Sequence, residues 1–268
     1  MIGTDLERII LPPDRRPRAP CARIPDRLRG EYAELVRRGL NSNLFALSDT
    51  PPLVVNGIFT IPKDSATPNG EQRLILDARP ANACMKKPPW FFLPTPDVFA
   101  RLVPGAAPLY SAKCDVSNFF HKLAIPESWS KWFGLPAVWS DEVGLSGPRH
   151  KVWPSCMTLP MGWSFSAFLA QRIHEAIIVR MGLGNMLITP DSHLRVDSGP
   201  RIAIYIDDVS FLGHCREEIS ALQLRYETTM EQHGLPTKPA KRCPPATAGV
   251  DIIGMAVDGI KHRIALSG

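Results

Sequence analysis

The sequence predicts an α+β protein, in which antiparallel strands and helices occupy separate stretches of the chain. Three observations carry this prediction. Short runs rich in apolar and β-branched residues at 56–62 and 72–78 predict strands, and 202–207 predicts a strand with one fully apolar face. The first two of these strands follow each other closely enough to form a hairpin. Apolar residues repeat with helical spacing over 164–181 and 216–233.

The composition is that of a folded protein with a mild basic excess. The 268 residues suffice for one large domain or two modest subdomains, and 44% of them are apolar. The net charge of +5 is compatible with a polyanionic partner. The six cysteines are scattered without zinc spacing, which predicts reduced thiols. A signal peptide and a membrane-length apolar run are both missing, which predicts an intracellular protein, cytoplasmic or nuclear, without a membrane partner.

The first part of the chain is expected to contain an arm, a helix and a hairpin. Residues 11–20 are basic and rich in proline, which favours a linker or an arm. Residues 26–40 carry apolar side chains near one helical face, with Asp26 as a candidate cap. The strands 56–62 and 72–78 are joined by the polar segment KDSATPNGE, which predicts a hairpin with a long tip.

The second part is expected to contain strands around two helices. LYSAKCDV, residues 109–116, predicts a strand, and further β structure is expected over 132–159. The segment 202–213 predicts a hairpin, as does 250–259. A helix is expected over 164–181, with Ser164 as its candidate cap, because apolar residues recur at every fourth position: Phe165, Leu169, Ile173 and Ile177.

Two adjacent acids, Asp207 and Asp208, interrupt the apolar run IAIYIDDVSFLG. An ordinary Asp-rich turn is the simplest interpretation, because buried carboxylates repel each other and are costly to desolvate. Mg²⁺ neutralises adjacent carboxylates, and two-metal phosphoryl chemistry needs a further acid, which Asp115 can supply. Strand alternation places Asp207 on one strand face with Tyr205 and lets Asp208 begin the turn. Asp207 is therefore expected to be the stronger metal ligand.

Five segments occur in an order that resembles reverse transcriptases of the retroviral and LTR-retrotransposon kind: QRLILDARPAN, SAKCDVSNFF, LPMGWSFSA, YIDD and HGLPTKPAKRC. The resemblance covers about residues 50–260. It implies a right-hand polymerase, with an antiparallel palm sheet packed on helices and the thumb absent. The implied parts are a basic, proline-rich arm at 1–23, fingers at 24–92 and 124–160, and palm at 93–123 and 161–268.

The resemblance also implies a two-metal catalytic site. The implied ligands of two Mg²⁺ ions, for which Mn²⁺ can substitute, are Asp115, the carbonyl of Val116, Asp207 and Asp208. Lys241 matches the lysine that protonates the leaving pyrophosphate. Lys238 is a rival for that role, and a solvated loop lysine is the alternative.

Five further residues are implied in nucleotide binding: Lys63, Arg73, Phe120, Met161 and Gly162. Lys63 and Arg73 match the fingers cations that hold the triphosphate, with solvated surface charges as the alternative. Phe120 falls at the aromatic gate that excludes a 2′-hydroxyl, with a buried core ring as its alternative. Gly162 lets the backbone approach template and nucleotide, and Met161 beside it is assigned no hydrogen-bonding role. IIGMAVDG resembles the hairpin that grips the primer end.

The implied function is RNA-directed DNA polymerase of a retroelement, which extends a primer on an RNA or DNA template with dNTPs. RNA-dependent RNA polymerases usually carry glycine before Asp-Asp and an aspartate at the position of Phe120, so Tyr205 and Phe120 favour DNA synthesis. The second alternative is a catalytically silent or truncated scaffold that binds nucleic acid. The presence of all three acids, Arg73 and Gly162 argues against it. The sequence leaves the oligomeric state open.

Three other patterns suggest no separate site. VDSG, at 196–199, contains the Asp-Ser-Gly of aspartic proteases, but Pro200 and the YIDD strand follow directly, which favours a polar loop. His214 and Cys215 lack partners for zinc. His174, on the predicted helix, is expected to be a surface or packing residue.

Overall fold

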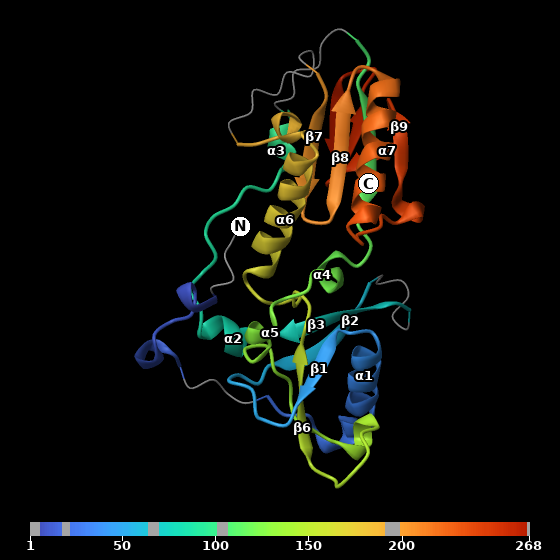
Figure 1. Cartoon of the computed structure of the whole chain (residues 1–268). Helices are drawn as coiled ribbons and strands as arrows, with labels where there is room; N and C mark the ends of the chain where they lie inside the picture. The colour runs from blue at the N-terminus through green and yellow to red at the C-terminus, as the bar shows by residue number, and fades with distance from the viewer. Residues whose placement is uncertain (1–5, 18–21, 64–69, 101–106, 191–198, 267–268) are drawn as a thin grey trace. The chain divides into compact units, whose positions relative to one another are not determined.

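The computed structural model describes residues 6–17, 22–63, 70–100, 107–190 and 199–266. It confirms the predicted mixture of helices and antiparallel sheets (Figure 1). The chain divides into two compact units, the first formed by Met1–Pro89 and Phe120–Ser166, the second by Trp90–Phe119 and Ala167–Gly268. The assignment of fingers and palm to these units stays a prediction.

Some expectations fall partly outside the described residues. These are the end of the basic arm at 18–21, the hairpin tip at 64–69, and residues 196–198 of VDSG. The cysteines within the described ranges are free thiols, as expected. Within those ranges, the helices are too short or too polar to cross a lipid bilayer.

The first unit combines one long helix with two small sheets. The antiparallel sheet has the order β1–β6–β5, and β2 pairs with β3 as the predicted hairpin. The elements are the 3-10 turns Leu6–Arg8, Pro13–Arg15, Asp26–Leu28 and Asp141–Val143, α1 (Arg29–Asn41), β1 (Phe45–Ser48), β2 (Gly57–Pro62), β3 (Gln72–Asp77), α2 (Arg79–Ala83), α5 (Glu127–Ser130), β5 (Val138–Trp139) and β6 (Lys151–Cys156). The short helix α4, Phe119–Lys122, crosses the boundary to the second unit.

The core of the first unit is built around Trp163. The rings of Trp129, Phe133 and Phe165 surround it with centroid distances of 6.0, 4.9 and 5.5 Å. The indole N–H, which must find an acceptor when buried, donates to the sulfur of Met85 at 3.1 Å. This packing fixes the loop that precedes α6.

That loop approaches the end of β3 so closely that only glycine fits at position 162. The Leu76 N–H donates to the Met161 carbonyl at 2.8 Å, and the Asn82 side chain donates to the Gly162 carbonyl at 3.0 Å. Gly162 has φ of +121°, and a Cβ there would lie 2.0 Å from the Leu76 carbonyl oxygen. Contact with the chain itself therefore requires this glycine, apart from any ligand.

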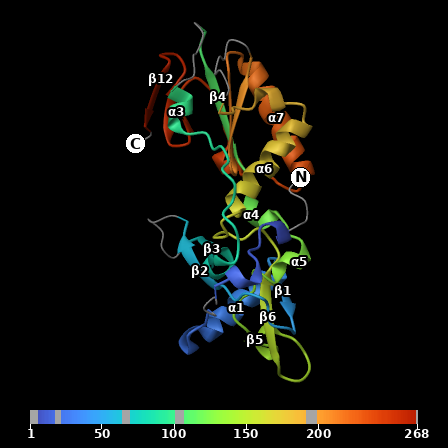
Figure 2. The ribbon, with the colours of Figure 1, turned by 90° about the vertical axis from the view of Figure 1, so that its left-hand side faces the viewer.

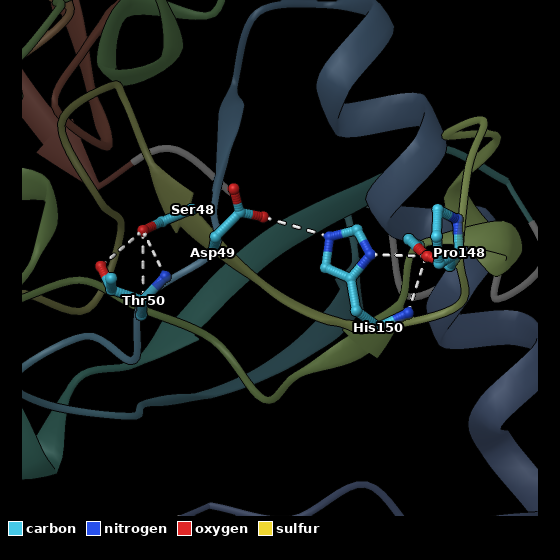
Figure 3. A network of polar contacts seen from close by, with 6 residues as sticks. Ser48, Asp49, Thr50, Pro148 and His150 are labelled. Atoms are coloured by element: carbon cyan, nitrogen blue, oxygen red, sulfur yellow. Dashed lines mark hydrogen bonds and ion pairs between the residues drawn. The ribbon is translucent and has the colours of Figure 1, made fainter.

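An exposed histidine ties the segment after β1 to the start of β6. Figure 3 shows the His150 ring between Asp49 and Pro148. Nδ1 lies 2.8 Å from the Pro148 carbonyl oxygen, and Nε2 lies 3.2 Å from Asp49 Oδ1. Both nitrogens face acceptors, which favours the doubly protonated ring. The Pro148 hydrogen bond, followed by that of Asp49, raises the pKa of His150.

The second unit is a layered structure around a four-stranded antiparallel sheet of order β7–β8–β4–β9. Helices α6 and α7 lie side by side on one face, while α3 and the sheet β10–β11–β12 cover the other (Figures 1 and 2). The elements are α3 (Pro96–Ala100), β4 (Tyr110–Asp115), α6 (Ser166–Arg180), β7 (Arg201–Tyr205), β8 (Asp208–Gly213), α7 (Arg216–Gln232), β9 (Cys243–Ala246), β10 (Val250–Ile252), β11 (Met255–Asp258), β12 (Arg263–Leu266) and the 3-10 turns Gly184–Met186 and Pro239–Lys241.

Helix α6 forms where predicted, with Phe165 and Ile177 buried, but its buried face also includes polar residues and leaves out Ile173. Ile173 is 38% exposed, whereas Gln171 and His174 are 2% and 0% exposed. Of the two expectations for His174, the surface position is wrong and the packing role is confirmed, because its ring is buried against Phe119 and Tyr226. Gln171 and His174 can be buried because both have hydrogen-bond partners in the interior. Apolar periodicity alone therefore does not identify the buried face of this helix.

The turn between β7 and β8 lies one residue earlier than expected. Strand β7 ends at Tyr205, which pairs with Asp208, so Ile206 and Asp207 form a two-residue turn. Asp208 is the first residue of β8, and the expectation that it begins the turn is wrong. Ile206 adopts φ of +59°, a conformation that apolar β-branched residues rarely take, so a turn that begins at this residue was not expected from its type.

Replacement of Gly162 by alanine should destabilise the protein by at least about 2 kcal/mol, because it adds a strained φ to an overpacked contact. The matched control is Gly144→Ala, at φ of +82° with open space around its Cβ, which adds only backbone strain of about 1 kcal/mol. Urea unfolding of both variants measures the difference. Equal losses would contradict the close approach to β3.

The His150 imidazole should titrate above the ordinary histidine pKa in a proton NMR titration, and Asp49→Asn should lower that pKa without restoring the ordinary value. Because the folded pKa is raised, the stabilising contribution is complete below the ordinary pKa and is lost as pH rises through the folded pKa. An unchanged His150 pKa in Asp49→Asn would show that the ion pair of Figure 3 does not form.

Candidate active site

Three acids meet at one end of the second unit's sheet. Asp115 is the last residue of β4, Asp208 is the first residue of β8, and the two are directly opposed in the antiparallel register. Asp207 precedes Asp208 in the turn, and its carbonyl accepts from the Val116 N–H at 2.9 Å. Like charges in opposed positions destabilise a sheet, so this arrangement needs compensation.

Three lysines supply that compensation. Lys238 forms an ion pair with Asp115 Oδ1, and Lys241 Nζ donates to Asp115 Oδ2 at 2.8 Å. Lys113 Nζ lies 3.5 Å from Asp208 Oδ2. The Lys238 N–H also donates to the Asp115 carbonyl at 2.8 Å, which holds the 3-10 turn of Lys241 against β4. The site is thus a compact cluster of alternating charges.

The ionisation of the three acids differs with their partners. Burial opposes the ionisation of Asp115, but the hydrogen bonds from Lys238 and Lys241 outweigh it and lower its pKa. Burial, with the Asp115 charge, raises the pKa of Asp207. Burial also raises the pKa of Asp208, against the attraction of its neighbouring lysine. The hydrogen bond to Asp115 raises the pKa of Lys241. The charged form of Asp115 is therefore stabilised by its partners, whereas the charged forms of Asp207 and Asp208 would be stabilised by additional positive charge.

The donor atoms suit a hard divalent cation, which takes carboxylate and carbonyl oxygens. Asp208 Oδ1 is buried without a hydrogen-bond partner among the described residues. However, within the described parts of the chain no three His, Cys, Asp or Glu side chains already form a metal cage. The ammonium groups of Lys238 and Lys241 lie on Asp115 instead. The residues fit a cation in kind and charge, provided that these ammonium groups move.

The predicted nucleotide-binding residues lie in the first unit. Lys63 and Arg73 are on the β2–β3 hairpin, where Lys63 Nζ pairs with Glu71 Oε2 at 2.7 Å and Arg73 is exposed. Phe120 is half-buried in α4. Met161 and Gly162 belong to the loop bound to the end of β3. Their roles toward a nucleotide stay predictions.

Sequence reasoning missed several residues at the site. Lys113 had a detectable signal, because strand alternation puts it on the same face as Asp115, two residues further on. Gln171 and His174 had a weaker one, as polar residues three positions apart on a largely apolar helix. Only the fold shows that both contact the turn of Ile206.

Comparison with solved structures identifies the fold. The structure matches that of a foamy viral protease-reverse transcriptase in complex with double-stranded DNA, with TM-score 0.65 and 17% identity, over 97% of this chain and 45% of that chain. A form of that protein designated dRH, also with double-stranded DNA, matches with TM-score 0.64 and 16% identity, over 95% and 38% of the two chains. This chain therefore spans less than half the length of either matched protein.

No protein-family model and no curated protein matches the sequence. The structural likeness extends over nearly the whole chain, but identities of 16% and 17% bear on the fold alone. The motifs quoted from the sequence predicted the same likeness independently. The chain has a reverse transcriptase-like fold.

Proposed function

We propose that this chain is the RNA-directed DNA polymerase part of a retroelement protein, which transfers nucleotides from dNTPs to a primer 3′-hydroxyl on an RNA or DNA template. In this proposal the first unit serves as fingers and the second as palm. The structural neighbours are reverse transcriptases bound to double-stranded DNA, which supports nucleic acid as the partner.

The observation that carries the proposal is the cluster of Asp115, Asp207 and Asp208 at one sheet end. A scaffold gains nothing from burying three carboxylates together, because each adds repulsion and desolvation cost. The raised pKa values of Asp207 and Asp208 show that the three lysines leave part of this cost uncompensated. Such a cluster is typical of a site that binds further positive charge during its function.

In the proposed site, Asp115, the Val116 carbonyl, Asp207 and Asp208 hold Mg²⁺. The metal would supply charge for the attacking and leaving oxygens of an in-line displacement. Lys241, already at the acid cluster, is placed to give its proton to the leaving pyrophosphate once its contact with Asp115 is released.

On the hairpin, Arg73 is proposed to bind the triphosphate, and Lys63 would exchange Glu71 for a phosphate oxygen. Phe120 is proposed to exclude a 2′-hydroxyl. The β10–β11 hairpin, which forms where IIGMAVDG predicted it, is proposed to contact the primer end.

One observation favours the alternative of a catalytically silent nucleic-acid-binding scaffold. The lysine side chains already neutralise Asp115, the acid expected to bind metal. A silent protein would keep this ion-paired state permanently. A polymerase would exchange it for metal when template, primer and dNTP are present.

Primer extension separates the two functions. With an RNA template, a DNA primer, Mg²⁺ and dNTPs, the wild-type chain should extend the primer, whereas rNTPs should not replace dNTPs. Asp207→Asn should slow extension by at least about a hundredfold, because metal-bound charge contributes several kcal/mol to transition-state stabilisation. Glu231→Gln, an exposed acid on α7, is the matched control and should retain activity.

Binding of template-primer without extension, under varied Mg²⁺ and Mn²⁺, would exclude the polymerase and support the scaffold. Equal activity of Asp207→Asn and wild type would contradict the assigned site. Extension with rNTPs would overturn the preference for DNA synthesis inferred from Phe120.

A further inference from the structure

A buried histidine on α6 touches three segments that build the candidate site. The His174 side chain is fully buried. Its ring meets Phe119, in the segment after Asp115, edge to face with centroids 5.5 Å apart. It stacks on the ring of Tyr226 from α7 at 5.7 Å. Its Nδ1 lies 2.8 Å from the carbonyl oxygen of Ile206, in the β7–β8 turn.

The two hydrogen-bond partners fix the tautomer of His174. A backbone carbonyl can only accept, so Nδ1 carries the proton and donates to Ile206. Nε2 is then the acceptor, and the Tyr226 hydroxyl, 2.8 Å away, donates to it. Burial lowers the pKa of His174 to about 4, which agrees with a neutral ring. The contrast with His150, whose nitrogens both face acceptors and whose pKa is raised, follows from the same chemistry.

Ile206 needs support because its backbone conformation is unfavourable. Its φ of +59° is rare for a β-branched residue, and such strain persists only where the surroundings determine it. The Ile206 N–H donates to Gln171 Oε1 at 2.8 Å, while its carbonyl accepts from His174. Both backbone groups of the strained residue are thus bound by side chains three positions apart on α6.

The orientation of this turn decides where two acids point. The Ile206 carbonyl belongs to the same peptide unit as the Asp207 N–H, and Asp208 follows directly. A rotation of that peptide would therefore displace both carboxylates from Asp115. Functional groups have to be held within about 0.5 Å of their working geometry, which requires support from a second layer of hydrogen bonds.

We propose that His174 and Tyr226 act as positioning residues for the acid cluster. The Tyr226 hydroxyl holds the His174 tautomer that donates to Ile206, and that hydrogen bond fixes the turn that presents Asp207 and Asp208. The effect on catalysis rests on the proposed polymerase function, whereas the rigidity of the turn is measurable without it. Packing alone would be served by apolar side chains at these two positions. The His174 imidazole and the Tyr226 hydroxyl are costly to bury unless both are hydrogen-bonded, so their presence indicates a role for the hydrogen bonds.

Amide hydrogen exchange and primer extension test the proposal together. Tyr226→Phe keeps the ring and removes only the hydroxyl. In the metal-free full chain it should speed exchange over 202–213 about tenfold, the factor that one hydrogen bond contributes to an equilibrium. It should lower kcat for primer extension by a similar factor with little change in KM for dNTP, because the contact acts on the acids.

Two variants of His174 should change amide exchange over 202–213 by different amounts. His174→Asn can place its amide nitrogen near the position of Nδ1 and should retain part of the wild-type protection. His174→Phe cannot donate and should show the fastest exchange over 202–213. If His174→Phe does not fold, the comparison of Tyr226→Phe with the asparagine variant and wild type still decides the question.

Tyr32→Phe is the matched control. The Tyr32 hydroxyl is also buried and donates to the Pro136 carbonyl at 2.7 Å in the first unit. Its loss should lower the melting temperature as Tyr226→Phe does, but leave exchange over 202–213 and kcat unchanged. Equal exchange over 202–213 in both phenylalanine variants would overturn the positioning role. A wild-type chain that extends no primer would count against the proposed function, while the exchange result would still decide the positioning.

Discussion

The placement of Asp115 directly opposite Asp208, in strands β4 and β8, is the constraint on which the rest of the site depends. Repulsion and desolvation both oppose this pair. Ammonium groups of the second unit compensate the negative charge. They come from Lys113 on β4 itself and from Lys238 and Lys241 in the segment before β9. The charge balance thus adds to the contacts that hold this segment, which include the ion pair of Arg242 with Glu227 on α7. Under the proposed function, the ammonium groups of Lys238 and Lys241 must move away from Asp115 when metal and nucleotide bind.

A charge cluster of this kind also constrains the helices beneath the sheet. The turn of Ile206 carries backbone strain, and α6 gives up apolar packing at Gln171 and His174 to hold it. Helix α7 contributes Tyr226 to this contact and Gln223, whose amide donates to the Lys113 carbonyl at 3.1 Å. Buried polar side chains from both helices therefore lie near the acidic end of the sheet, on the face that α6 and α7 cover. The Ile206 backbone groups and the His174 ring have partners in the same unit, which favours a rigid turn. Gln223 Oε1 and Asp208 Oδ1, in contrast, are buried without a hydrogen-bond partner among the described residues.

Local periodicity predicted much of this fold, and tertiary contacts decided the remainder. Helix α7 and the hairpins at β2–β3 and β10–β11 form where their patterns indicated, since their side chains alternate or repeat as a half-buried surface requires. Strand β9 was not expected, because its sequence CPPA contains two prolines and it pairs with β4 only through an irregular register. Asp207 and Asp208 stood out as acids within an apolar run, Asp115 was a candidate third acid, and the resemblance to a polymerase family joined the three into one site. Their counter-ion Lys113 was missed, although strand alternation with Asp115 could have indicated it. The requirement for glycine at position 162 depends on a distant backbone that no local pattern reveals.

The unfolding free energies of two asparagine variants, measured without divalent metal at pH 7, test the charge constraint most directly. Asp207→Asn removes a carboxylate whose pKa is raised by burial and by the Asp115 charge, so it should stabilise the protein. Asp115→Asn removes the shared partner of two ammonium groups, so it should destabilise the protein by at least about 1 kcal/mol. Changes of opposite sign in the two unfolding free energies would support the account that the acids repel one another and that the lysines compensate Asp115. An Asp115→Asn variant as stable as wild type, with Asp207→Asn less stable, would contradict it.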